Sequence, residues 1–428
     1  MMLLQKSLPC DRIERSDEVF PQMLGLIRGR VFYNLVSWHR VLALLPGFQL
    51  NRGFMEQMMG VREPLPDEIV QEIIKQNIGS RFADGFALAR TGIGLLRQLW
   101  GLPRQIARFQ IRLDTALAAP PLPLPQMSGE ELVAHYRDLE RQLLKKWDAP
   151  LVNDFFAMIF CGVLRSLCVK WLGDTSRTLQ NELLLDGGDI ISAEPPRRIV
   201  KMALLAAAQP GLAAVLADPE ISTHKKIAVL QKVPALALAF ESYLTDFGDR
   251  CLEELKLESP TVRDDPASLL ISIGAMADRP RVEAMSPAPL NLAQPRDPLK
   301  HLIFRYVLRQ ARERICAREN LRFERTRLFG RVRSILRARG HRLHADGQLG
   351  SAHDVFYLEV GEVLAAWDAT GTTAGLGALA KQRRAEFAIS LRHRFSRAAP
   401  AVHCLAARHH HASKNWRLGG NGWCRRNG

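Results

Sequence analysis

The chain has 428 residues, which is enough for two or three domains of about 150 residues and excludes a miniprotein or a disordered tail. Hydrophobic residues make up 47% and charged residues 24%, the composition of an ordinary globular protein. Aromatic residues are few, at 7%, and Leu, Ala and Arg are frequent, which favours helices over strands. We therefore predict a mainly α protein with a multi-helix body.

The formal net charge of +15 is distributed unevenly along the chain. Residues 388–428 contain eight Arg or Lys residues and no Asp or Glu. The body that precedes them is therefore only mildly basic. This location matters because a basic surface for nucleic acid would have to lie on the folded part of the protein.

Cysteine usage and hydropathy predict a cytoplasmic protein. The seven cysteines form no Cys-x-x-Cys pair, which is typical of reduced thiols rather than of a disulfide framework. The apolar run at residues 1–10 is too short for a signal peptide, and the longest apolar stretch, 155–164, is about half the length of a membrane span. We expect no membrane partner.

Helical periodicity dominates the first two thirds of the chain. Apolar residues recur every three or four positions over 82–100 and again over 106–117, which predicts two helical segments with a kink near Pro103. Prolines at 120–125 indicate an extended connector, and the sequence Ser128-Gly-Glu-Glu131 indicates a capping box. Further helices are predicted at 17–45, 52–60, 67–79, 129–147, 151–172, 196–208 and 234–254.

A proline-rich stretch at 280–298 precedes a long helix predicted over 298–339. Asp354-Val-Phe-Tyr-Leu358 predicts a short strand element near 355–358, followed by helices at 359–367 and 376–388. Residues 389–428 lack acidic residues and apolar period, so we interpret them as a non-native, frame-shifted and disordered tail. The predicted parts are 1–119, 128–279, 296–388 and this tail.

Common catalytic signatures are absent from the sequence. It contains no GxxxxGK[ST], no GxGxxG after a strand, no HExxH and no GxSxG motif. A metal site could be imagined from four residues near the C-terminus, but their spacing matches no metal finger. We therefore predict no metal site and no cofactor-binding residues in this chain. The four residues are Cys404, His409, His411 and Cys424.

The most informative segment is an arginine-dense helix. Thirteen Arg lie between residues 305 and 342, against three Glu, above an apolar stripe. One interpretation is a solvated helix face. The other is a helix that faces an anion, because guanidinium groups bind phosphate bidentately and stabilise charge on a transferring phosphoryl group. Arg318 and Arg322 lie one turn apart, and Glu319 adjoins them as a group that could accept a proton.

Several segments, in order, resemble the central region of phosphoenolpyruvate synthase-like dikinases, and rifampicin phosphotransferase is similar. The resemblance runs from about residue 17 to about residue 387. The segments are Gly29-Arg-Val-Phe-Tyr-Asn-Leu35, Leu44-Leu-Pro-Gly-Phe48, Phe54-Met-Glu-Gln-Met-Met-Gly-Val-Arg-Glu63, Phe247-Gly-Asp-Arg-Cys251 with Glu254, Leu255 and Leu257, Arg318-Glu-Asn-Leu-Arg-Phe-Glu-Arg325, and Asp354-Val-Phe-Tyr-Leu358 with Glu362.

The resemblance implies a three-part enzyme. An ATP-grasp domain splits ATP with Mg²⁺, a swivelling domain carries the phosphoryl group on a histidine, and a helical domain receives a small-molecule acceptor. This chain resembles only the helical domain, so we expect an inactive fragment whose partners are the two missing domains. The acceptor, pyruvate, a rifamycin-like compound or another hydroxyl compound, is left open.

The resemblance also implies catalytic residues. In the rifampicin enzymes a matching helix bears an Arg-Glu-x-x-Lys pattern that faces the phosphohistidine. Arg318 and Glu319 match that pattern, and Arg322 replaces the Lys. The replacement keeps the charge but exchanges a point cation for a planar fork.

A second function from another class fits the composition, namely a helical nucleic-acid-binding or scaffold protein that uses the arginine-rich helix. Two observations argue against nucleic acid as a partner. More than half of the excess charge lies in the tail, and no aromatic residues interleave the basic helix as stacking platforms would require.

Overall fold

The computed structural model describes residues 19–27, 30–43, 52–53, 55–56, 61, 65–77, 81–120, 122–174, 179–185, 191–251, 256–278, 295–368 and 375–392. These residues divide between two compact units, which are described separately. The first unit draws on Met1–Arg104, Cys161–Val163 and Lys381–Gly428, and the second on Gln105–Phe160 and Leu164–Ala380. The division into parts predicted from the sequence stays a prediction.

The first unit contains a β-hairpin that the sequence analysis did not predict. Strands β1 (Leu24–Ile27) and β2 (Arg30–Tyr33) pair antiparallel, with Leu24 opposite Tyr33. The helix predicted over 17–45 is therefore wrong across the hairpin, and the predicted range is helical only in the short 3₁₀ helix η1 (Phe20–Gln22) and in α3 (Leu35–Ala43) among the described residues. Gly25 and the run of β-prone side chains in β2 explain the difference, because they fit a pleated pair better than a helix.

Helix α3 anchors the hairpin. The Trp38 indole Nε1 donates to Met23 O at 3.2 Å, and the rings of Trp38 and Tyr33 meet edge to face at 5.9 Å. Helix α5 (Asp67–Asn77) confirms the helix predicted at 67–79. Within the helix predicted at 52–60, the described residues 52–53 and 55–56 are helical. The buried core shared by these segments comprises Leu35, Leu65, Val70 and Ile73.

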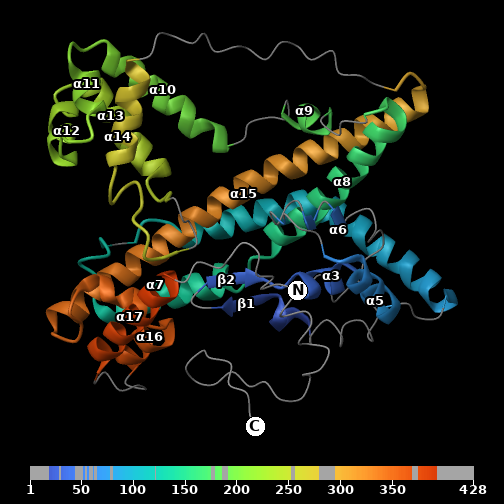
Figure 1. Cartoon of the computed structure of the whole chain (residues 1–428), viewed down its shortest axis with the longest axis horizontal. Helices are drawn as coiled ribbons and strands as arrows, with labels where there is room; N and C mark the ends of the chain where they lie inside the picture. The colour runs from blue at the N-terminus through green and yellow to red at the C-terminus, as the bar shows by residue number, and fades with distance from the viewer. Residues whose placement is uncertain are drawn as a thin grey trace. The chain divides into compact units, whose positions relative to one another are not determined.

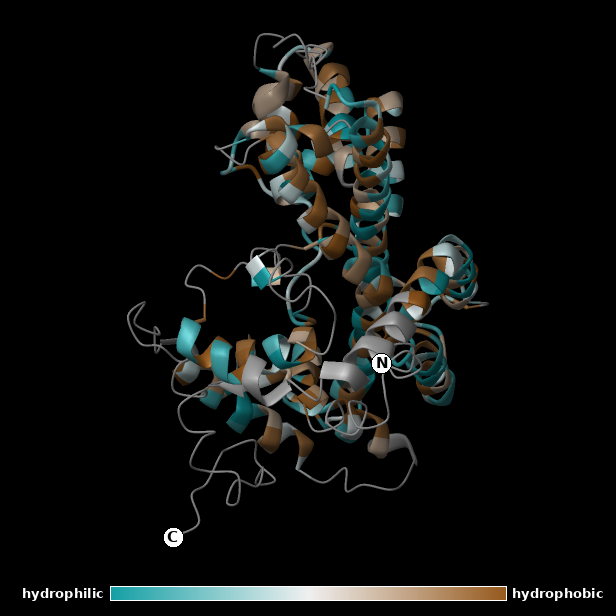
Figure 2. Ribbon diagram, turned by 90° about the vertical axis from the view of Figure 1, so that its right-hand side faces the viewer, coloured by the Kyte–Doolittle hydropathy of each residue, from teal (hydrophilic) through white to brown (hydrophobic). Residues whose placement is uncertain are grey.

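The mainly α prediction is confirmed, and helices supply the described secondary structure from residue 81 onward (Figure 1). Hydrophobic and hydrophilic residues alternate along the helices, as amphipathic packing requires (Figure 2). The elements are α6 (Arg81–Ala116), α7 (Gly129–Leu139), a π-helical segment (Glu140–Leu144), α8 (Asp148–Leu172), α9 (Leu179–Leu185), η3 (Ile191–Ala193), α10 (Glu194–Ala207), α11 (Leu212–Ala217), α12 (Thr223–Leu230), α13 (Pro234–Phe247), α14 (Ala267–Ala277), α15 (Pro298–Ala345), η4 (Ala352–Tyr357), α16 (Val360–Asp368) and α17 (Leu376–Arg392).

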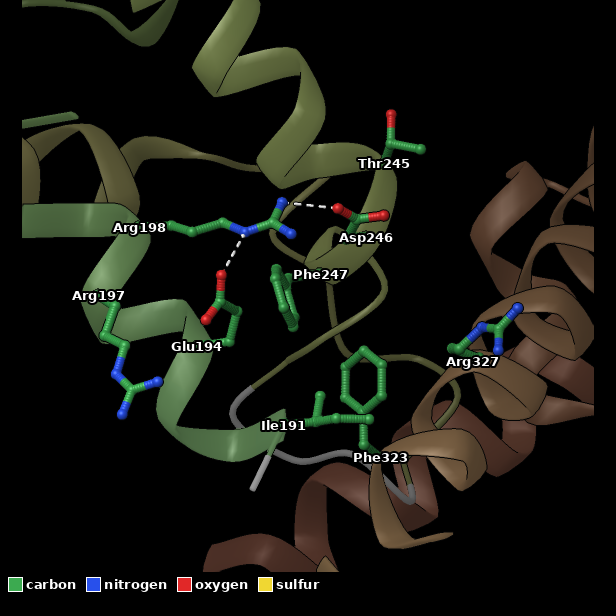
Figure 3. Close-up of a pocket in the computed structure, with 9 residues that line it drawn as sticks. All are labelled: Ile191, Glu194, Arg197, Arg198, Thr245, Asp246, Phe247, Phe323 and Arg327. Carbon is green, nitrogen blue, oxygen red and sulfur yellow. Dashed lines mark hydrogen bonds and ion pairs between the residues drawn. The ribbon is translucent and has the colours of Figure 1, made fainter. Parts of the chain in front are cut away.

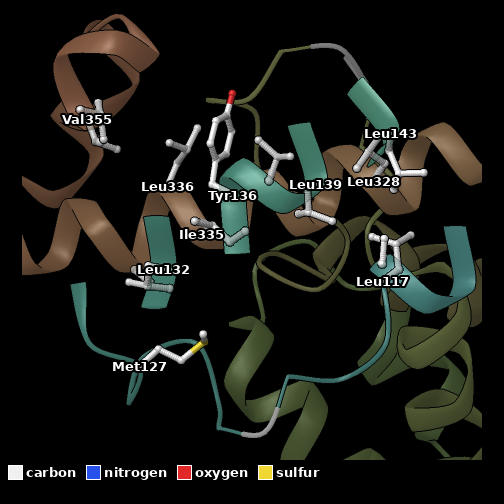
Figure 4. Packing of buried hydrophobic residues seen from close by; sticks show 14 of the residues in the cluster. Leu117, Met127, Leu132, Tyr136, Leu139, Leu143, Leu328, Ile335, Leu336 and Val355 are labelled. Atoms are coloured by element: carbon white, nitrogen blue, oxygen red, sulfur yellow. The ribbon is translucent and has the colours of Figure 1, made fainter. Parts of the chain in front are cut away.

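One core of the second unit forms where α7 packs on the C-terminal half of α15 (Figure 4). The predicted capping box starts α7, since the Ser128 side chain accepts from Glu131 N and the Glu131 carboxylate accepts from Ser128 N. The fully buried leucines of α7 then face the apolar stripe of α15. Members of this core include Leu132, Tyr136, Leu139, Leu143, Leu328, Ile335, Leu336 and Val355.

A second core holds the bundle of α10 to α14 together. Helix α14 crosses α11 at Gly274, where an added Cβ would collide with the backbone of Ala217 and come within 2.7 Å of Ala213 O. The close approach explains a glycine inside a buried helix. Members of this core include Met202, Ala206, Leu216, Leu236, Phe240, Phe247, Leu270 and Ile273.

The strand predicted near 355–358 is wrong. Residues Ala352–Tyr357 form the 3₁₀ helix η4, whose start is capped by Ser351 Oγ accepting from His353 N at 3.3 Å. The only sheet among the described residues is the β1–β2 hairpin, so this segment has no strand to pair with. It buries Val355 against α15 instead.

Other predicted boundaries shift modestly. The two segments on either side of Pro103 form one helix, α6, with the proline inside it. Helix α13 ends at Phe247 rather than 254, and α15 continues to Ala345 rather than 339. Helices α9, α11, α12 and α14 were not predicted. The predicted tail, 389–428, lies outside the described residues after 392.

Among the described residues, one helical stretch, Gly129–Leu172, reaches the length and hydropathy of a membrane span, a test that core helices of soluble proteins also pass. It consists of α7, the π-helical segment and α8. Packing covers part of its apolar surface: Phe156, Leu164 and Cys168 are at most 4% exposed, whereas Leu151 and Val169 are 55% and 41% exposed. The stretch is therefore weak evidence for a membrane span.

Candidate functional site

Helix α15 is the scaffold of the candidate site (Figure 1). Its 48 residues begin after Asp297, whose carboxylate accepts from the backbone N–H groups of Leu299 and Lys300, and Pro298 occupies the first helical position. The helix is long enough to contact α7, α8 and the α10–α14 bundle at different turns. The surroundings of each α15 residue therefore depend on which of these elements packs against its turn of the helix.

The arginines of α15 do not form one solvated face. Arg333 is 1% exposed and donates to the carbonyls of Leu257 and Lys256 at 3.0 and 2.9 Å. Arg312 and Arg331 donate to Leu183 O and Leu117 O at 2.9 and 3.0 Å. Several arginines of α15 therefore bind backbone carbonyl groups at loop and helix ends. The sequence analysis considered a solvated face or an anion-binding face for these arginines and did not predict this structural role.

Arg318, the first predicted catalytic residue, faces α8. Its Nε lies 3.4 Å from Asp154 Oδ1. The Arg318 side chain is 24% exposed and the Asp154 side chain 42% exposed, so the pair opens to solvent on one side. Because Asp154 engages Nε, the terminal nitrogens of Arg318 are the atoms that an incoming anion would meet.

Several charged side chains around Asp154 influence the pKa of its carboxyl group. Burial raises its pKa to about 6, Arg318, Arg325 and Arg322 pull the pKa down, and Glu319 pushes it up. All three predicted catalytic residues thus act electrostatically on one carboxyl group. Arg322 is exposed and Glu319 is half-buried.

A hydrogen bond at Arg314, one turn before Arg318 on α15, fixes α8 against α15. Asn153 is completely buried, and its Nδ2 donates to the backbone carbonyl of Arg314 at 2.9 Å. Farther along the same two helices, the rings of Phe160 and Tyr306 meet edge to face at 6.3 Å. These contacts hold Asp154 in register with Arg318.

Asp154 and Asn153 were not identified from the sequence as site residues. The available signal was a pair of adjacent polar residues in the otherwise apolar segment 151–164. Such a pair marks the point where an apolar helix meets polar partners, because a buried polar group needs a hydrogen bond. The partner itself, more than 150 residues away, is visible only in the fold.

The segment Phe247-Gly-Asp-Arg-Cys251 also packs on α15. The ring of Phe247 lies 5.3 Å from that of Phe323, and Arg333 Nη2 donates to Cys251 Sγ at 3.5 Å. Between them, the Asp249 side chain occupies the space that a Cβ at Gly330 would need. Burial raises the pKa of Asp249, and the nearby arginines, Arg263 first, oppose the shift.

A cavity of about 750 Å³ opens on the side of α15 that faces α10 and α13 (Figure 3). The rings of Phe247 and Phe323 lie in its middle, and Arg327, which comes from α15 as Phe323 does, points away from the two rings. Arg318, Glu319 and Arg322 do not line it. The lining residues are Ile191, Glu194, Arg197, Arg198, Thr245, Asp246, Phe247, Phe323 and Arg327.

No group of three His, Cys, Asp or Glu side chains within the described part of the chain is placed to hold a metal ion. The residues considered at the sequence level, Cys404, His409, His411 and Cys424, lie outside the described residues. The prediction of no cofactor stays a prediction.

Comparison with known proteins gives one match, in the middle of the chain. Residues 150–319 match the family model of the rifampicin phosphotransferase fourth domain. The match supports a helical central region like that of the PEP-utilising enzymes. The resemblance inferred from the sequence is confirmed to this extent, as a helical central region like that of the PEP-utilising enzymes. This rifampicin phosphotransferase-like region includes Asp154, Arg318 and Glu319, and Arg322 follows three residues after it. No curated protein matches the chain.

Proposed function

We propose that the chain is the substrate-accepting helical domain of a dikinase-type phosphotransferase. The supporting observation is the convergence of Arg318, Glu319 and Arg322 on the Asp154 carboxyl group, at the junction of two helices in the family-matched region. In the reaction, a phosphoryl group passes from ATP to a carrier histidine and then to pyruvate or another acceptor.

Each side chain has a role in this proposal. Arg318 and Arg322 stabilise the negative charge that develops on the phosphoryl group, because guanidinium donors match phosphate oxygens. Glu319 orients the acceptor or takes its proton. Asp154 acts through Arg318: the 3.4 Å contact to Nε orients the guanidinium toward the open side of the pair.

The remaining functions belong to other domains. ATP and Mg²⁺ bind to an ATP-grasp domain, and a phosphohistidine domain carries the phosphoryl group. Transfer depends on positioning these parts together. The chain alone, given ATP, Mg²⁺ and pyruvate or a rifamycin, makes no phosphorylated product.

The internal contacts of α15 favour this proposal over a nucleic-acid-binding protein. Arg312, Arg331 and Arg333 bind backbone carbonyls, and Arg327 pairs with Glu324 at 2.6 Å, so these groups are already occupied. Phosphate contacts along a nucleic acid would require them to be released. A salt-sensitive mobility shift with a fragment ending at Phe387 would favour the nucleic-acid alternative.

Complementation in trans tests the proposal. The full chain is mixed with the ATP-grasp and phosphohistidine domains of a related enzyme, ATP, Mg²⁺ and an acceptor, and the phosphorylated acceptor is measured by mass spectrometry. We expect Arg318→Gln to lower the rate by about 10²–10³ and Glu319→Gln by about 10²–10⁴. The control is Arg309→Gln, an exposed α15 arginine. Equal rates for all variants, or turnover without the added domains, would contradict the proposal.

A further inference from the structure

Helix α6 presents large apolar side chains to solvent on one face. Ile93, Leu96 and Trp100 recur at helical spacing, so they form one stripe along the helix, and they are 55%, 54% and 78% exposed. On another side of the same helix, Leu99 and Leu102 are buried. A helix that is apolar on more than one side is normally covered on each of them. The stripe is therefore a surface that the described residues leave uncovered, as interaction sites do.

Two arginines border this stripe. Arg97 and Arg104 are exposed, and because they lie two turns apart on α6, they follow the same edge of the stripe. Residues 85–113 contain no Asp or Glu. Neither arginine forms an ion pair with another described residue. The face thus combines uncovered hydrocarbon with a row of positive charge that the described part of the chain does not balance.

The position of the charges indicates what covers the stripe. A second copy of this chain would bring its own arginines toward Arg97 and Arg104, and like charges across an interface oppose association. A helix that lies on an anionic bilayer has cations on both edges of its apolar face, where they reach the lipid headgroups. The cations of residues 93–104 lie on one edge only. A partner helix with carboxylates along one edge of its apolar face matches this arrangement.

We propose that this face of α6 binds an acidic amphipathic helix of a partner protein. Apolar side chains of the partner cover Ile93, Leu96 and Trp100, and two of its carboxylates, placed two turns apart, bind Arg97 and Arg104. Trp100 is the main anchor, because a large aromatic side chain gains most from leaving water. The charge pairs fix the direction and register of the partner. The proposal does not rest on the phosphoryl-transfer function.

Synthetic peptides test the proposal. The probe is a fluorescein-labelled amphipathic helix with leucine at the a and d positions of its heptads and glutamate at the e and g positions, whose like charges keep it from pairing with itself. Fluorescence anisotropy measures its binding to the full chain. We expect a dissociation constant below about 100 µM. The same peptide with lysine in place of glutamate should bind at least about tenfold more weakly.

A charge swap gives the sharpest comparison. The Arg97→Glu/Arg104→Glu variant should bind the glutamate peptide at least about tenfold more weakly than the parent does, and should bind the lysine peptide instead. The matched control is Lys201→Glu/Lys225→Glu, which makes the same change of charge at exposed lysines of α10 and α12. This control should bind both peptides as the parent does.

A second variant tests the apolar anchor. Trp100→Ala should weaken binding of the glutamate peptide by about tenfold or more. Because the Trp100 side chain is mostly exposed, the melting temperature of this variant should equal that of the parent.

Three results would overturn the proposal. The first is the absence of binding by the glutamate peptide, and the second is equal binding of that peptide by the parent and the charge-swapped variant. The third is an occupant of another kind. Such an occupant would be shown by Trp100-dependent binding to vesicles of phosphatidylserine and phosphatidylcholine without peptide binding, or by self-association of the chain in sedimentation that Trp100→Ala abolishes.

Discussion

At the scale of single residues, Asp154 links the ionisation of the site to stability. Its pKa is raised to about 6 in the folded chain, above the unfolded value of about 3.9. The protonated acid therefore favours the folded state below pH 4, and this contribution is lost as the pH rises through 6. The shift corresponds to about 3 kcal/mol without screening. Because the side chain is 42% exposed, we expect about 1 kcal/mol.

Urea unfolding of the parent and of Asp154→Asn at pH 4 and pH 7 measures this contribution. Asn mimics the neutral acid, so the parent should lose about 1 kcal/mol relative to the variant between the two pH values. A carboxyl titration by NMR checks the cause: Arg318→Gln should raise the Asp154 midpoint, and Arg309→Gln should not. An Asp154 midpoint near 4 would contradict the account.

The same residue shows where sequence reasoning ends. Arg318, Glu319 and Arg322 could be proposed from the sequence because they share one turn of a helix and a family pattern, and their catalytic role stays a prediction. Asp154 could not, because its role depends on a contact between α8 and α15. No local pattern encodes the distance between residues so far apart in the chain.

At the scale of elements, the helix crossing at Gly274 makes a sharp prediction. Gly274→Ala should destabilise the chain by about 1–3 kcal/mol, because the new Cβ collides with the backbone of α11 and the helices must move apart. Gly361→Ala in α16 is the control, since no heavy atom lies within 4 Å of its Cβ position and the helix gains about 0.5–1 kcal/mol. Thermal unfolding of both variants distinguishes them, and equal melting temperatures would contradict the packing described.

Elements set by local patterns were the predictable ones. The capping box at Ser128 and the long period of α15 were recognised, since both are written in residues close together. The β1–β2 hairpin and η4 were mispredicted, because a strand needs a partner. The helix predicted over 17–45 overlooked that β1 and β2 can pair with each other. The strand predicted near 355–358 assumed a partner strand, and the segment forms η4 instead.

At the scale of the whole molecule, the mainly α architecture followed from composition and periodicity, whereas the use of the arginines did not. A net charge of +15 suggested a basic surface, yet many arginines of α15 bind carbonyls and carboxylates inside the second unit. Arg305, Arg309 and Arg322 are exposed, and of these only Arg322 lies one turn from the partly exposed Arg318, so the two form a small site with two guanidinium groups. A site of this size fits one phosphoryl group better than a polyanion such as a nucleic acid.

The central claim is that this chain carries out the acceptor half of a phosphoryl transfer. Its most direct test is a single-turnover measurement with a phosphohistidine domain that has been phosphorylated beforehand, which removes the ATP step. Loss of the label to pyruvate or a rifamycin should require this chain, should slow by at least about 10² in Glu319→Gln, and should be unchanged in Arg309→Gln. Transfer that proceeds at the same rate without the chain, or with Glu319→Gln, would contradict the account.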